Sequence, residues 1–410
     1  MKPNPAEALP VKAAPAPVSK PVPLLGIRAI RLPIEARILI LALGFRLVVA
    51  AAGFIANVAI PDFQDQGFTV MERPNPFWDR FARWDSGWYH GIASTGYNYV
   101  EGGRNNLAYF PVYPQVMGVV GRALGGAQED YYYAGILISW LSFMIAMPLL
   151  YRLARMDVPR KAAMRATVYA AVFPSAYFFG VVYSESLFLL TLVGATLALR
   201  TRRWLWAALA AAVMTATRVN GVMFLPALAL IGWDAAERNR PDRGRALAAV
   251  AAGLIGISGY SLFNYAITGN PFEWYDSITR WGYLPGGHPL AGLWAIADKL
   301  LTHPYEYIVS ERMAPYDTLN ALAAAAALII LPFIWMRFGR GYAAIVLMGL
   351  LLPLSSGQYE GLGRYCSVLF PLSILFGSIK GEIRHFGLVT GFVLFYTIGL
   401  VLFGNVHPLF

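Results

Sequence analysis

The chain has few charged residues and a single cysteine. Only 14% of its 410 residues are charged and 57% are hydrophobic, with a mean hydropathy of +0.51, which excludes an ordinary soluble protein. Because Cys366 stands alone, an intrachain disulfide and a cysteine metal cluster are excluded. GxGxxG and Walker phosphate-binding motifs and repeats of fixed period are also missing. The composition predicts an all-α, polytopic membrane protein.

Long apolar runs predict how often the chain crosses the membrane. Residues 36–60 are apolar except for Arg37 and Arg46, and they are long enough to cross a hydrocarbon core of about 30 Å. Further apolar runs lie at residues 131–151, 162–182, 184–200, 204–233, 246–268, 317–336, 342–356, 364–379 and 386–404. If the run at 204–233 forms two short helices that meet near Arg218, the sequence predicts about eleven spans, within a range of ten to twelve.

Basic residues mark the cytoplasmic side. They cluster at residues 152–165, 200–203, 238–245, 337–340 and 380–384, and the positive-inside rule places all of these clusters inside. Residues 1–35, rich in Pro, Ala and Lys, are then a disordered cytoplasmic tail ahead of a single membrane domain, 36–410. The segments 61–130 and 269–316 lie outside, so the apolar stretch at 109–120 is interfacial or re-entrant. The net charge of +10 mostly anchors the inner side and is not a nucleic-acid footprint, because the cations are spread over many short loops.

A carboxylate stands among aromatic residues just after the first predicted span. Spacings of three and four residues place Trp78, Phe81, Asp85, Trp88, Tyr89 and Ile92 on one face of a helix. Such a helix would lie flat at the outer interface and hold Asp85 partly out of water, as a base toward a hydroxyl. In the alternative reading, Asp85 only caps a helix that starts at Ser86. A rival acid, Asp79, lies about 240° from Asp85 on a continuous helix, so the two should not share one site.

Four ionisable residues lie within or beside apolar runs: Arg46, Glu185, Arg218 and Arg364. An ion in the membrane costs about 2.5 to 3.5 kcal/mol, so each needs a partner or a cavity. Arg218 or Arg364 could grip a phosphate with paired hydrogen bonds, or else both snorkel to lipid headgroups. Glu185 either contacts a sugar or an arginine, or it is a solvated hairpin tip. Arg46 is expected to bond neighbouring helices.

Several short motifs follow one another along the chain. They are Arg83-Trp84-Asp85, Trp88-Tyr89, Ile92-Ala93, Gly96-Tyr97, Tyr109-Phe110-Pro111, Tyr113-Pro114, Phe173-Pro174, Tyr183-Ser184-Glu185-Ser186-Leu187-Phe188, Arg218-Val219-Asn220-Gly221 and Gly363-Arg364-Tyr365. In this order they resemble the mannosyltransferase family of phosphatidylinositol-glycan class V (PIG-V), over residues 36–380. One departure is Trp88-Tyr89, where eukaryotic members tend to carry a His or another residue, and this leaves the acceptor open.

The resemblance implies a glycosyltransferase of the GT-C type that takes a sugar, a mannose, from a polyprenyl-phosphate donor. Asp85 matches the usual base, which would take the proton of an acceptor hydroxyl in an inverting transfer at the outer face of a bacterial plasma membrane. Arg218 or Arg364 would steady the departing phosphate. The other expected substrate-binding residues are Trp84, Trp88, Tyr89, His90, Glu185, Asn220 and Tyr365. The acceptor, whether glycolipid, glycan or protein, stays open.

No soluble cofactor and no metal is expected. The spacing of His90, His288 and His303 fits no metal-ligand motif. The aromatic residues of 269–316 suit sugar stacking or a lid, and they suit an aromatic belt equally well. A rival function is a multi-span transporter or lipid flippase, which would also keep buried ions and broken helices. That function predicts internal repeats and leaves the aromatic, acid-bearing loop without a role.

Overall fold

The computed structural model describes residues 32–63, 76–237, 239–283, 286–311, 313–357, 359 and 361–409, and all of its regular elements there are helices. The all-α prediction is therefore confirmed for the described part of the chain. Residues from Ile34 onward form one compact unit. The tail predicted at 1–35 lies outside the described residues except at its C-terminal end, and it stays a prediction.

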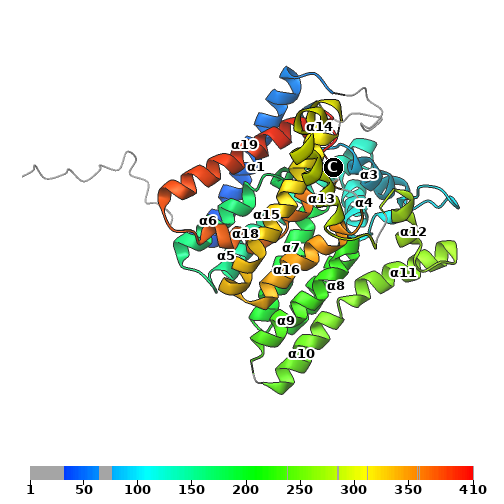
Figure 1. Cartoon of the computed structure of the whole chain (residues 1–410). Coiled ribbons are helices and arrows are strands. Elements are labelled where there is room, and N and C mark those ends of the chain that lie inside the picture. Colours follow the sequence, from blue (N-terminus) through cyan, green and yellow to red (C-terminus); the bar gives the residue numbers. More distant parts are fainter. Residues whose placement is uncertain are drawn as a thin grey trace, which may run out of the picture. The chain divides into compact units, whose positions relative to one another are not determined.

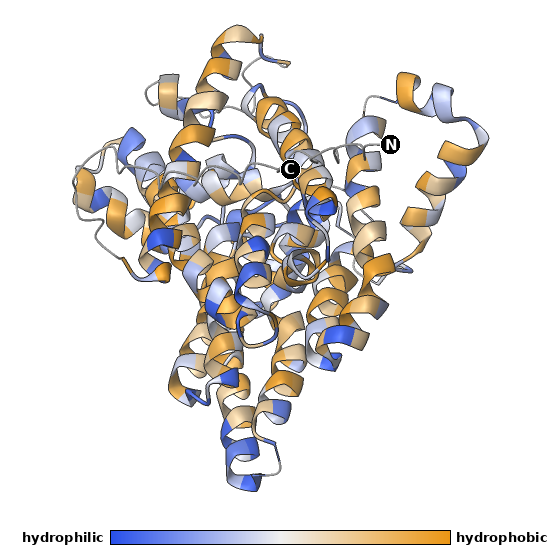
Figure 2. Ribbon diagram, turned by 90° about the vertical axis from the view of Figure 1, so that its left-hand side faces the viewer, coloured by the Kyte–Doolittle hydropathy of each residue, from blue (hydrophilic) through white to orange (hydrophobic). Residues whose placement is uncertain are grey.

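Five helices in the described ranges are long and apolar enough to cross a membrane. They are α1 (Ile34–Ala59), α5 (Gln128–Ala154), the continuous run of α10 (Arg240–Ala251) and α11 (Leu254–Thr268), α15 (Ala314–Phe338) and α19 (Glu382–Gly404). The most apolar stretch of α5 is 67% buried, against 22% in α15 and in α19, so α5 lies at the centre and the other two face outward. Figure 2 shows hydrophobic residues along these helices and hydrophilic ones around the α9–α10 turn.

Other apolar runs form shorter helices, which are α7 (Glu185–Arg200), α8 (Trp204–Thr217), η3 (Val219–Phe224), α9 (Leu225–Ala235) and α16 (Arg340–Leu354). Three of them, α8, η3 and α16, contribute residues to the lining of the site described below. The chain breaks between α8 and η3 at Arg218, which is extended with φ −152° and ψ 147°, as the polar residues there predict. Gly221 allows η3 to fold back on α8, because a Cβ atom there would lie 2.6 Å from the Met214 carbonyl oxygen.

Two runs predicted as spans are not continuous helices. The run at 162–182 divides into α6 (Arg160–Ala171) and η2 (Ala176–Gly180), and the run at 364–379 into α17 (Leu362–Ser367) and α18 (Phe370–Gly377). Pro174 lies in the first break, where it lacks a backbone donor and disfavours helical conformation in the residue before it. Pro371 is the second residue of α18, a position in the first turn of a helix that tolerates proline, so it marks the restart after the second break.

The segments predicted to lie outside contain short helices. They are α2 (Pro76–Asp79), α3 (Asp85–Thr95), η1 (Asn106–Ala108), α4 (Val112–Leu124), α12 (Glu273–Arg280), α13 (Ala291–Thr302) and α14 (Pro304–Ser310). Figure 1 shows α3, α4 and α12 together on one side of the compact unit. The single aromatic helix predicted from Trp78 to Ile92 is wrong, since the chain leaves helical geometry before Trp84, whose φ is +53°. The stretch at 109–120 lies mostly in α4, a helix of 13 residues, and its interfacial or re-entrant placement stays a prediction.

Candidate active site

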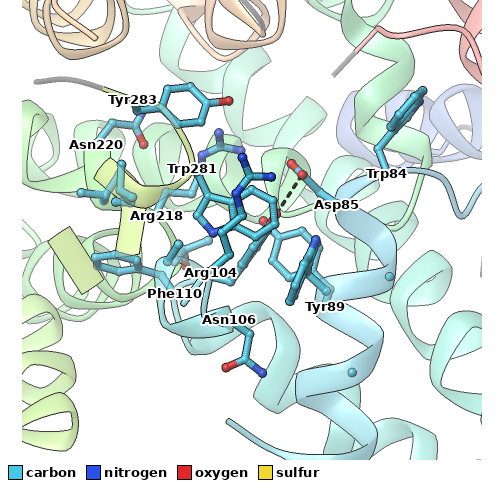
Figure 3. Close-up of a pocket in the computed structure, with 18 of the residues that line it drawn as sticks. Trp84, Asp85, Tyr89, Arg104, Asn106, Phe110, Arg218, Asn220, Trp281 and Tyr283 are labelled. Atoms are coloured by element: carbon cyan, nitrogen blue, oxygen red, sulfur yellow. Dashed lines mark hydrogen bonds between the residues drawn. The ribbon is translucent and has the colours of Figure 1, made fainter. Parts of the chain in front are cut away.

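One large cavity opens where the short helices meet the ends of the longer ones. Its volume is about 1440 Å³, and it is lined from α3, η1, the α8–η3 break, α12, the end of α16 and α17. The predicted site residues that line it are Trp84, Asp85, Trp88, Tyr89, His90, Arg218, Asn220, Arg364 and Tyr365. Figure 3 shows Asp85, Arg104 and Arg218 pointing into it. The sequence therefore identified residues from three distant segments that share one cavity.

Asp85 is the first residue of α3, and both of its carboxylate oxygens have donors. The Tyr109 hydroxyl donates to Oδ1 at 3.0 Å, and Arg364 Nη1 donates to Oδ2 at 2.8 Å. The Asp85 backbone N–H donates to the Tyr183 hydroxyl at 3.2 Å. The side chain is 25% exposed and faces the cavity. Asp85 thus lies inside the helix start and not in the capping position, and an acid there also suits the positive end of the helix.

Glu185 joins the two predicted phosphate-binding arginines. Its Oε1 forms an ion pair with Arg218 Nη1 and lies 3.2 Å from Arg364 Nε, which is not aligned for a hydrogen bond. Glu185 is only 1% exposed, so the solvated-tip reading is wrong, and it lies behind the cavity wall instead of lining it. The side chains of Arg364 and Arg218 are 8% and 11% exposed, which also excludes snorkelling to headgroups. Asp85, Arg364, Glu185 and Arg218 thus form a chain of alternating charge.

Two acceptor atoms in this region are buried without a donor. In the described part of the chain, neither Asn220 Oδ1 nor Glu185 Oε2 receives a hydrogen bond. Asn220 is 2% exposed and lines the cavity beside Arg218. Buried polar atoms are nearly always paired, so these two are the atoms that a bound molecule or a water would satisfy.

Aromatic rings form much of the cavity wall. Trp88 stacks on Tyr109, with centroids 5.9 Å apart and planes at 13°, and Trp281 meets Trp88 edge-on at 4.9 Å. The Tyr89 hydroxyl lies 3.0 Å from Ser184 Oγ. Such faces suit stacking on a sugar ring and resist conformational change because the rings pack on one another.

The remaining predicted residues hold the wall or pack beside it. His90 stacks on Tyr132 at 4.0 Å, and its Nε2 lies 2.9 Å from the Gln128 carbonyl oxygen. Trp84 Nε1 donates to the His407 carbonyl oxygen at 3.1 Å. The Tyr365 ring lies under the Arg218 guanidinium at 5.1 Å. These contacts fix the aromatic side chains of the cavity wall around the row of charged side chains that runs from Asp85 to Arg218.

Arg46 and Asp79, two further ionisable residues in or near the first predicted span, lie outside the cavity lining. Arg46 donates to the Tyr396 hydroxyl at 3.3 Å and to the Ala176 carbonyl oxygen at 3.5 Å, so it links helices as predicted. Asp79 is buried in an ion pair with Arg83 at 2.8 Å and does not line the cavity. Asp79 and Asp85 do not share a site, but the cause is the break between α2 and α3 and not their angle on one helix.

Several lining residues were not predicted as site residues. Tyr109 stood in a recognised motif, but nothing local indicated that its hydroxyl contacts Asp85. Arg104, Tyr275 and Trp281 also line the cavity. No pattern around Arg104 marks it, and Trp281 was one aromatic among many in 269–316. His288 and His303 do not line the cavity.

The model of the Mannosyltransferase (PIG-V) family matches residues 29–234. No curated protein matches the chain.

The chain is also similar to solved structures of two other proteins. The ArnT structure from Cupriavidus metallidurans bound to undecaprenyl phosphate has a TM-score of 0.48 and 13% identity, covering 90% of this chain and 76% of ArnT. The apo oligosaccharyltransferase from Archaeoglobus fulgidus has a TM-score of 0.43 and 11% identity, covering 90% of this chain and 56% of the archaeal one. The chain thus spans little more than half the length of the archaeal structure.

Proposed function

Because the chain belongs to the PIG-V mannosyltransferase family and is therefore a glycosyltransferase, we propose that it moves a mannose from a polyprenyl-phosphate carrier to an acceptor hydroxyl. One observation carries the proposal: a carboxylate, Asp85, faces the same cavity as two arginines from distant segments, Arg218 and Arg364, whose side chains are nearly buried. A base and cations close together are what such a transfer needs. The acceptor, whether glycolipid, glycan or protein, is not specified by this geometry.

Asp85 acts as the general base. Its carboxylate takes the proton of the acceptor hydroxyl, and the oxygen attacks the anomeric carbon of the sugar from the face opposite the phosphate. The bond from the anomeric carbon to the phosphate oxygen breaks, and polyprenyl phosphate leaves with the electron pair. One displacement of this kind inverts the anomeric configuration. Tyr109 and Arg364 hold the carboxylate in place during the attack.

Arg218 and Arg364 stabilise the phosphate as it departs. Guanidinium groups bind phosphate oxygens through paired, charge-assisted hydrogen bonds, and these strengthen as negative charge develops on the leaving oxygen. Glu185 fixes both groups from behind, so neither must reorganise when the donor binds. The unsatisfied Asn220 Oδ1 is placed to accept a hydrogen bond from a sugar hydroxyl. The reaction requires no soluble cofactor and no metal.

The cavity is at the outer face of the membrane in this proposal. The helix α7 begins at Glu185 beside the cavity and ends at Arg200, and α16 begins at Arg340 and ends next to cavity residue Ser356. At the far ends, Arg340 pairs with Asp234 at 2.6 Å, among the clustered basic residues. The positive-inside rule puts those ends in the cytoplasm, which leaves the cavity outside. About eleven spans, with α2, α3 and α4 at the interface, complete this topology.

The test is sugar transfer from radiolabelled polyprenyl-phosphate mannose by the purified protein in detergent. Asp85→Asn should lower turnover by about 100-fold or more, the usual contribution of a general base. Asp85→Ala should do the same, while Asp298→Asn, at an exposed acid on α13 outside the cavity, should leave turnover unchanged. Full activity in folded Asp85 variants would reject Asp85 as the base. Failure of the wild-type protein with every lipid-linked sugar would shift the proposal to transport.

A further inference from the structure

Arg104 is a cation of the cavity that the sequence analysis did not single out. It lies on the loop between α3 and η1 and lines the cavity together with Arg218 (Figure 3) and with Arg364. Its guanidinium lies over the Trp281 ring, 5.2 Å from the centroid, and its Nε donates to the Arg280 carbonyl oxygen at 3.3 Å. Arg104 therefore bridges the first outer segment and α12 at the cavity wall.

The loop that carries Arg104 is built by buried amides. Asn105 Oδ1 accepts from the Val100 N–H at 2.7 Å, and Asn106 Oδ1 accepts from the Asn98 N–H at 3.0 Å. Asn105 and Asn106 are 1% and 5% exposed. These side chains replace the backbone hydrogen bonds that a helix or strand would supply. The loop therefore has a defined path, and the backbone of Arg104 has a fixed position beside the cavity.

A buried acid fastens the same loop to α12. Glu273 is 2% exposed and pairs with Arg280, and the Asn105 side-chain amide donates to it at 3.5 Å. Trp281, the next residue after Arg280, donates from Nε1 to the Asn105 carbonyl oxygen at 3.4 Å. The loop that carries Arg104 and the C-terminal end of α12 that carries Trp281 are therefore fixed to each other.

Arg104 is the cavity arginine without a carboxylate partner. Arg218 has Glu185 as its partner, and Arg364 has Asp85 and Glu185. Arg104 is exposed and has no carboxylate partner within the ranges that the structure describes. Among the described residues at the cavity and directly behind its wall, three arginines stand against two carboxylates, so one positive charge is in excess, and it faces the cavity on Arg104.

We propose that Arg104 is a third donor-binding arginine, which contributes the counter-charge for a donor that carries a single negative charge. The inference rests on the proposed function and adds to its donor site one further residue, Arg104 from the first outer segment. With such a donor bound, the charges of the cavity sum to zero. A diphosphate would leave surplus negative charge in a partly desolvated space, which is unfavourable. The Arg104–Trp281 pair closes the donor site from the side of α12.

The test compares Arg104→Gln with Arg122→Gln, an exposed arginine on α4 that does not line the cavity. For polyprenyl-phosphate mannose, Arg104→Gln should raise KM by about tenfold or more, as expected for one charge-assisted hydrogen bond, with kcat nearly unchanged. Arg122→Gln should change neither constant. The wild-type enzyme should bind a polyprenyl-diphosphate sugar more weakly than the monophosphate analogue. An unchanged donor KM in Arg104→Gln, or a raised acceptor KM in its place, overturns the proposal.

A binding measurement separates this inference from the proposed transfer reaction. Equilibrium binding of tritiated polyprenyl-phosphate mannose requires no acceptor and no turnover. Arg104→Gln should weaken that binding by the same factor as it raises KM, whereas Arg122→Gln should leave binding intact. Equal binding by the wild type and Arg104→Gln refutes the role of Arg104, whether or not mannose is transferred.

Discussion

Arg364 donates a hydrogen bond to Asp85 at 2.8 Å across 279 positions of the sequence. The same guanidinium lies 3.2 Å from Glu185, so one arginine connects the proposed base to the acid that orders the phosphate site. A donor phosphate that draws Arg364 toward itself would weaken the hold of Arg364 on Asp85. The Tyr109 hydroxyl would then remain on the carboxylate, which links occupation of the donor site to the availability of the base.

Glu185 should be essential to the fold of the site as well as to its chemistry. Glu185→Gln removes the carboxylate from between two guanidiniums that are nearly buried, and breaking a buried pair in this way typically costs about 3 to 5 kcal/mol. We expect a large fall in the free energy of unfolding, measured in mixed detergent.

The double variant Glu185→Gln/Arg218→Gln tests whether that cost comes from the stranded charge. Removing Arg218 as well eliminates the cation whose carboxylate partner was removed, whereas Arg364 still has Asp85, so the double variant should be less destabilised than the sum of the single variants. Additive effects would show that Glu185 and Arg218 are not coupled.

Tyr109→Phe should impair the base without disturbing the aromatic wall. The variant keeps the ring that stacks on Trp88 but loses the hydroxyl that donates to Asp85 Oδ1. The hydroxyl holds the carboxylate that takes the acceptor proton, so its loss should lower kcat by about tenfold with little change in donor KM. Tyr305→Phe, at a tyrosine that is 79% exposed, is the control. An unchanged kcat would mean that Tyr109 does not support the base.

The part of the site that depends on local pattern could be predicted from the sequence. Arg218 interrupts an apolar run, and an ionised residue in such a place needs a break and a partner, both of which the structure shows. Asp85 among aromatic residues likewise indicated the cavity. A local pattern does not show which residues far apart in the sequence pair with each other. The Asp85–Arg364 contact and the Arg104–Trp281 contact therefore could not be predicted.

The broken helix before Asp85 shows the same limit. Residues 80–84 contain no proline or glycine, so the helical spacing of the aromatic residues favoured one continuous helix. The structure instead holds Trp84 at a positive φ, a conformation that costs free energy for a bulky residue. Contacts with the C-terminal end compensate, since Trp84 donates to the His407 carbonyl oxygen and Arg83 Nε to that of Gly404 at 3.3 Å. Tertiary contacts with residues more than 300 positions away thus override the local pattern.

Buried tyrosines of the site predict how stability depends on pH. Burial raises the pKa of Tyr89, and burial with the charge of Asp85 raises that of Tyr109, above the ordinary value of about 10. The folded state therefore keeps these protons when the unfolded chain has lost them, so stability is full below about pH 10 and falls as pH rises further. The melting temperature in detergent should decrease from pH 10 to pH 11, and Tyr89→Phe/Tyr109→Phe should flatten that decrease. An equally steep decrease in the double variant contradicts the prediction.

Glu273 should affect donor binding although it lies outside the cavity lining. Glu273→Gln leaves Arg280 without its carboxylate and loosens α12 from the loop that carries Arg104. Donor KM should rise by about threefold to tenfold with little change in kcat. The variant weakens the contact between α12 and Arg104, while Asp85, Arg218 and Arg364 stay in place. Glu306→Gln, at an exposed acid on α14, should have no effect.

If Glu273 acts through Arg104, then Glu273→Gln/Arg104→Gln should raise KM no further than Arg104→Gln alone, because the contact that Glu273 supports is already lost. Multiplying effects in the double variant would show that Glu273 and Arg104 act on the donor independently.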